Sequence, residues 1–90
     1  MAKKPLAELI DQETIMEMSD VLIHVNEFIE NAGRFQLEET LRDVEGVIAP
    51  RFSPAHDHLM FVAYDPDSTT ATAILGQVRE QGFGAQIVAI

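Results

Sequence analysis

The sequence contains no cysteine among its 90 residues. This absence excludes disulfide bonds, thiolate catalysis, iron–sulfur ligation and every metal site built on thiolates. Long apolar runs are also missing, because no uncharged stretch approaches the roughly 20 apolar residues that a membrane-spanning helix needs. The residues after Lys3 and Lys4 do not form the apolar core of a secretory signal. We therefore expect a cytoplasmic protein that does not enter a membrane.

Basic residues are scarce, since six Lys and Arg stand against fifteen Asp and Glu, for a formal net charge of -9. A surface of this sign repels phosphate backbones and anionic lipids, so neither nucleic acid nor a membrane is an expected partner. The composition, 47% hydrophobic and 23% charged, is typical of globular proteins, and the length suits one core. The sequence predicts a helical extension over residues 1–18 and one folded body over residues 19–90.

The extension carries a short helical pattern over residues 5–12. Pro5 suits the first turn of a helix, and Leu6, Leu9 and Ile10 share one face at spacings of three and four. A helix of this length does not persist alone in water. We expect it to pack on the body of the protein or on a second copy.

The body alternates between the two-residue period of strands and the three-to-four-residue period of helices. The pattern predicts strands over 20–25, 47–52, 58–64 and 85–90, and helices over 33–44 and 69–82. This order predicts an α+β fold, a ferredoxin-like βαββαβ sandwich with two helices on one face of a four-stranded antiparallel sheet. Pro50 suits an edge strand because it cannot donate to a ladder. The uncovered sheet face would be apolar in part, and the N-terminal helix is the candidate to cover it.

Three short motifs follow one another in the body: Glu45-Gly46-Val47, Tyr64-Asp65-Pro66 and Gln81-Gly82-Phe83. In this order and spacing they resemble the heavy-metal-associated (HMA) domain, the fold of cytosolic copper chaperones and of N-terminal modules of copper and zinc P-type ATPases. The similarity covers about residues 20–90, within the predicted domain of residues 19–90. The resemblance implies a ferredoxin-like domain of the heavy-metal transport or detoxification type.

The family binds its metal with a Cys-x-x-Cys loop after the first strand, and that loop is degenerate here. Counting back from Gly46 by the family's spacing places the two cysteines at Glu30 and Gly33, and Phe28 in the place of a methionine. Cu(I) is soft and prefers thiolates, whereas Glu30 offers a hard oxygen and Gly33 offers no side chain. Transfer of Cu(I) between thiolates therefore cannot run through this loop.

Other residues can supply donors at the same end of the predicted sheet. Imidazoles of His56 and His58, in the turn between the second and third strands, are ligands for Zn, Ni or Cu(II). With Glu27 or Glu30 they would complete a three-ligand site. The alternative is that both histidines are solvated turn residues. His24 is expected on the other side of its strand from the core, as a surface histidine.

Enzyme motifs are absent from the sequence. Gly82-Phe83-Gly84 is followed by no lysine and opens no helix, so it is not a phosphate-binding loop. The sequence therefore favours a small HMA-like binding protein that is not an enzyme. The alternative is a metal-free module for protein interaction or structure, a homodimer formed through the open sheet face and the N-terminal helix. An enzyme with a cleft between subunits is the third hypothesis.

Overall fold

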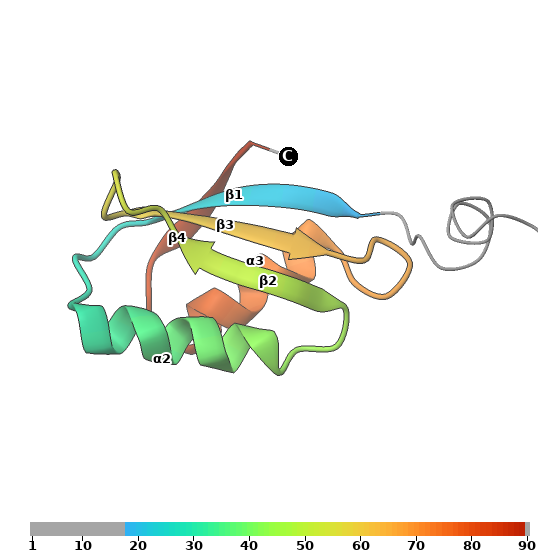
Figure 1. Cartoon of the computed structure of the whole chain (residues 1–90), viewed down its shortest axis with the longest axis horizontal. Coiled ribbons are helices and arrows are strands. Elements are labelled where there is room, and N and C mark those ends of the chain that lie inside the picture. The colour runs from blue at the N-terminus through green and yellow to red at the C-terminus, as the bar shows by residue number, and fades with distance from the viewer. Residues whose placement is uncertain (1–17, 90) are drawn as a thin grey trace, which may run out of the picture.

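The computed structural model describes residues 18–89, which form one sheet and two helices. The elements are β1 (Ser19–Val25), α2 (Asn31–Arg42), β2 (Val47–Phe52), β3 (Leu59–Tyr64), α3 (Ala71–Glu80) and β4 (Ala85–Ala89). The strands pair antiparallel in the order β2-β3-β1-β4, and both helices lie on the same side of the sheet (Figure 1). The βαββαβ prediction is therefore confirmed. The helix predicted over residues 5–12 lies outside the described residues.

The core lies between the sheet and the two helices. Alternate residues of β1, namely Val21, Ile23 and Val25, are at most 1% exposed, as their two-residue period predicted. Leu41 of α2 and Ile74 of α3 meet them with no exposed surface. Burial of a large aliphatic side chain stabilises a protein by about 1.5–3 kcal/mol, so this layer holds the fold together.

Strand β2 lies at an edge of the sheet, where Pro50 was expected. Helix α3 is capped by Thr70, whose Oγ1 accepts a hydrogen bond from the Ala73 amide at 3.0 Å. Helix α2 begins at Asn31, two residues before the start that the sequence predicted. Its first turn buries no side chain, so the apolar period could not reveal it. None of the helices within residues 18–89 has the length and hydropathy to cross a membrane.

Candidate functional site

Three segments meet at the end of the sheet where β1 stops. The Val25 amide donates to the carbonyl oxygen of His58 at 2.8 Å, and the Asn26 amide donates to that of Gly84 at 2.8 Å. The loop before α2, the β2–β3 turn and the start of β4 are thus joined through their backbones. The antiparallel topology predicted this meeting, because β1 and β2 point the same way and end at the same edge.

Both positions that the family's spacing assigns to cysteine lie at the start of α2. Glu30 is the N-cap residue, with extended backbone and an exposed side chain that makes no capping bond. Gly33 lies in the first turn, and a Cβ atom there would stand 2.6 Å from Cγ2 of Ile29. Ile29 is only 7% exposed and belongs to the core. Position 33 therefore has no room for a side chain unless Ile29 moves.

Arg34 occupies the centre of this end of the molecule. Its guanidinium lies 3.4 Å from the Asp57 carboxylate, and Nη2 donates to Oδ1 of Asn31 at 2.6 Å. The same guanidinium lies over the rings of Phe28 and Phe52, at 5.9 and 6.0 Å from their centroids. Cation–π contacts of this kind contribute about 0.5–1 kcal/mol each at exposed sites. Arg34 therefore links the loop, the helix and the β2–β3 turn, a role that no motif in the sequence indicated.

Three of the predicted metal ligands, Glu27, Glu30 and His56, have the following surroundings in the structure. The Glu27 carboxylate accepts hydrogen bonds from the Gly84 amide at 3.0 and 3.2 Å, which ties the loop to the start of β4. Glu30 points outward from the N-terminus of α2, and His56 is exposed in the turn. Residues 18–89 hold no group of three or more His, Asp or Glu side chains placed to bind one metal ion. Metal binding by His56, His58, Glu30 and Glu27 stays a prediction.

His58 is instead paired with His24. Their rings stack with centroids 5.5 Å apart and planes 20° from parallel. His58 Nδ1 donates to the carbonyl oxygen of Val25 at 2.8 Å, which leaves Nε2 with its lone pair. Gln86 Nε2 donates to Oδ1 of Asn26 at 3.0 Å, and His24 Nδ1 lies 2.9 Å from Gln86 Nε2 and 3.2 Å from Oδ1 of Asn26. No motif in the sequence indicated that these two histidines meet; the strand register brings them together, since His24 pairs with Leu59, the residue after His58.

Exposed aromatic side chains flank the start of α2. Phe28 is 62% exposed and Phe35 is 64% exposed. A shallow depression of about 330 Å³ adjoins them, lined by Phe35, Phe52 and Pro54 together with polar side chains around Arg34 and Asp57. The amide of Phe52 donates to the Glu38 carboxylate at 2.8 Å, which holds this wall of the depression against α2. This end of the molecule thus presents exposed apolar side chains beside segments that the Phe52–Glu38 and Arg34–Asp57 contacts hold together.

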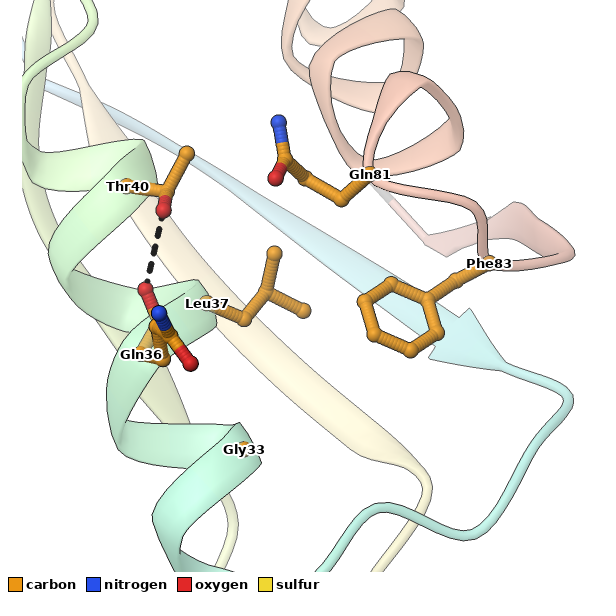
Figure 2. A pocket seen from close by; sticks show the side chains of 6 residues that line it. All are labelled: Gly33, Gln36, Leu37, Thr40, Gln81 and Phe83. Carbon is orange, nitrogen blue, oxygen red and sulfur yellow. Dashed lines mark hydrogen bonds between the residues drawn. The ribbon is translucent and has the colours of Figure 1, made fainter.

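A second depression, of about 260 Å³, lies between α2 and the segment that follows α3 (Figure 2). Leu37 and Phe83 approach each other across it, while Gln36, Thr40 and Gln81 form its polar rim. The Thr40 hydroxyl is used within the helix, where it donates to the carbonyl oxygen of Gln36 at 3.0 Å. No residue that lines it is acidic, basic or a histidine, so its lining offers no acid–base chemistry.

Comparison with known proteins is informative at the level of structure. No protein-family model matches the chain, and no curated protein matches it in sequence. Among solved structures, the copper-binding domain from HMA7, a P-type ATPase, is similar with a TM-score of 0.70 at 23% identity, covering 78% of this chain and 93% of that one.

Two further solved structures are similar to this chain over most of its length. Oxidized MerP from Ralstonia metallidurans CH34 gives a TM-score of 0.69 at 15% identity, over 79% of this chain and 97% of that one. The yeast copper transporter domain CCC2A gives 0.67 at 25% identity, over 77% and 93%. The structure therefore has the fold of the heavy-metal-associated domains found in copper-binding proteins, as the three motifs indicated, in a chain without cysteine.

Proposed function

We propose that the chain is a small binding protein of the heavy-metal-associated type, which engages a partner protein of heavy-metal transport and does not carry Cu(I) on thiolates. The neighbours support the class, since one is a copper-binding domain of a P-type ATPase and another a copper transporter domain. The missing cysteines and the blocked position at Gly33 argue against thiolate carriage. The end of the molecule where the family binds metal offers, in this chain, an exposed surface around Phe28 and Phe35 to which a partner protein can bind.

The observation that carries this proposal is the exposure of Phe28, whose ring lies under the Arg34 guanidinium, and of Phe35, which lines a depression together with Arg34. Aromatic and arginine side chains are enriched among the residues that contribute most to protein–protein binding. Asp57 holds the Arg34 guanidinium against the ring of Phe28, so this part of the surface is ordered before binding and loses little entropy. Glu38 and Asp57 line the same depression as Phe35, and the chain carries a net charge of -9. A matching partner surface has an apolar pocket with a basic rim.

Photocrosslinking tests this surface. A photoreactive phenylalanine analogue at position 28, and separately at position 35, is expected to capture the same partner protein in the cell. The same analogue at Thr72, an exposed position on α3, is not expected to capture it. With the captured partner purified, Phe28→Ser and Phe35→Ser should each weaken binding at least tenfold, and Thr72→Ala should leave it unchanged. Capture of the same proteins from all three positions, or unchanged affinity in both serine variants, would refute the proposal.

A second candidate function is binding of a borderline metal ion by histidine. The observation that favours it is the His24–His58 pair. A ring nitrogen bonded to a backbone carbonyl, as at His58 Nδ1, is the usual support of a metal-ligating imidazole, whose other nitrogen then faces the ion. Two imidazoles suit Zn, Ni or Cu(II), and they offer Cu(I) nothing comparable to a thiolate pair.

Calorimetric titration with Zn(II), Ni(II), Cu(II) and Cu(I) separates the two possible ligand sets. We expect His58→Ala to reduce the affinity for any ion that binds by at least tenfold. If the pair forms the site, His24→Ala has the same effect and His56→Ala has none. If His56, His58, Glu30 and Glu27 form it, the effects of His24→Ala and His56→Ala are exchanged. Absence of heat for every ion would remove metal binding from the function of the chain.

A further inference from the structure

The sheet face opposite the two helices is partly apolar. Among residues 18–89 no helix or loop packs over it, as the separation of both helices to the other side shows (Figure 1). Phe61 is 49% exposed at its centre and lies opposite Leu22 on β1 and Arg51 on β2. The open-face patch comprises the small and large apolar residues that alternate with the core positions of the four strands: Leu22, Ala49, Phe61, Ala63 and Val88.

We propose that residues 5–16 of the same chain pack on the open-face patch. The first support is where the chain enters. Strand β1 lies inside the sheet, and its first residue, Ser19, follows directly on the 18 residues that precede it. The segment therefore joins the described fold three residues before Leu22, next to Asp20, which pairs with Ala63 of the patch. An entry at a sheet edge would have left the segment farther from this centre.

The second support is length. Residues 13–18, when extended, span about 20 Å, which is enough to turn the chain back over the sheet. Residues 5–12 as a helix measure about 12 Å. Four strands spaced about 4.8 Å apart are about 14 Å wide, so such a helix crosses the patch from one side to the other. Leu6, Leu9 and Ile10 would then supply the apolar stripe that faces Phe61.

The third support is charge. Arg51 is exposed beside Phe61, and within the described residues no hydrogen bond or ion pair engages its guanidinium. Glu8 and Asp11 stand between and after the apolar residues of the segment, and each can meet an arginine at the border of the patch. A second copy of the chain is a poorer occupant, because each copy brings a formal charge of -9 and the two repel.

Paired cysteines test the proposal cleanly, because the chain has none of its own. In the full chain, Leu9→Cys with Ala63→Cys is expected to form an intramolecular disulfide under mild oxidation, at least tenfold faster than Leu9→Cys with Thr72→Cys, a control on the helix side. Disulfide-linked dimers as the main product of the first pair would identify a second copy as the occupant and overturn the proposal. Equal rates for both pairs would show a face that residues 5–16 do not cover, and would also overturn it.

A spin label provides the second measurement. Attached at Ala49→Cys of isotope-enriched protein, the label is expected to broaden the amide signals of residues 5–12, and the broadening should persist when this protein is diluted with unlabelled protein of natural isotope abundance. In a mixed sample, the label is on natural-abundance protein and the isotope-enriched protein carries none, so this sample reports contact between copies and should show no broadening. Broadening that appears only in the mixed sample between different molecules contradicts the proposal. The open-face patch is separate from Phe28 and Phe35, so this result is independent of the partner-binding test.

Discussion

Replacing Gly46 with alanine is expected to lower the free energy of unfolding by about 3 kcal/mol. Gly46 has φ of +91°, a region in which a Cβ atom costs about 1–2 kcal/mol. The added atom would also stand 2.8 Å from Cγ2 of Thr69 and 2.9 Å from Cβ of Ser68. Forcing an extra carbon into a packed site costs about 1–3 kcal/mol. Urea denaturation followed by circular dichroism measures the sum.

Gly82→Ala is the matched control. Gly82 also has a positive φ, of +99°, but a Cβ atom there would meet nothing within 4 Å. We expect a loss of about 1–2 kcal/mol from backbone strain alone. The difference between the two variants isolates the contact with Ser68 and Thr69. Equal losses in both variants would show that the contact contributes nothing.

The contact of Gly46 with Ser68 and Thr69 lies where two of the three sequence motifs meet. The Asp65 amide donates to the carbonyl oxygen of Gly46 at 2.8 Å, and the Asp65 carboxylate accepts from the Asp67 amide at 2.9 Å and from the Ser68 hydroxyl at 3.0 Å. Two of the three motifs that carry the resemblance therefore meet in one turn–turn junction. They are structural motifs, and they persist in a chain that lacks the family's thiolates.

The parts of the fold that could be predicted are those set by local pattern. The alternation of Val21, Ile23 and Val25 predicted the buried face of β1. A capping threonine, Thr69 or Thr70, predicted the start of α3, and the structure shows that Thr70 is the cap. Contacts between segments far apart in the sequence leave no periodic pattern in it, so they could not be predicted. Arg34 reaches Asp57 across 23 residues, and His58 meets Val25 across 33. Their contacts depend on strand register, which one-residue irregularities such as the shift at Leu22/Ile23 can alter.

At the start of α2, too, the sequence could not reveal how distant and neighbouring side chains pack. The family's spacing assigns its two cysteines to positions 30 and 33, but it could not show that a core side chain fills the space beside position 33. That space belongs to Ile29, whose β-branched side chain is stiff and buried. A thiolate at position 33 would therefore need more than a sulfur atom, because the packing of Ile29 leaves no space beside that position.

Placing two thiolates at positions 30 and 33 is thus expected to require a third substitution, at Ile29, to make space for them. Glu30→Cys with Gly33→Cys should destabilise the fold by about 1–3 kcal/mol, because the new Cβ would lie 2.6 Å from Cγ2 of Ile29. Adding Ile29→Leu moves the branch one carbon outward at nearly constant volume and should recover most of that loss. With space restored, the two thiolates across the first turn of α2 should bind Cu(I), which competition with a chromophoric chelator measures.

Gly76→Ala supplies the control for this last argument. Gly76 lies inside α3 with nothing within 4 Å of a Cβ atom, so alanine there should stabilise the protein by up to about 1 kcal/mol through helix propensity. Gly33→Ala makes the same substitution in the other helix, but we expect it to destabilise the protein, because the new Cβ would lie 2.6 Å from Cγ2 of Ile29. Stabilisation of the protein by Gly33→Ala, as by Gly76→Ala, would contradict this expectation. So would a cysteine pair that binds Cu(I) as tightly without Ile29→Leu. Either result would show that Ile29 does not exclude a thiolate from position 33, so that only the absence of cysteine stands against Cu(I) binding at this loop.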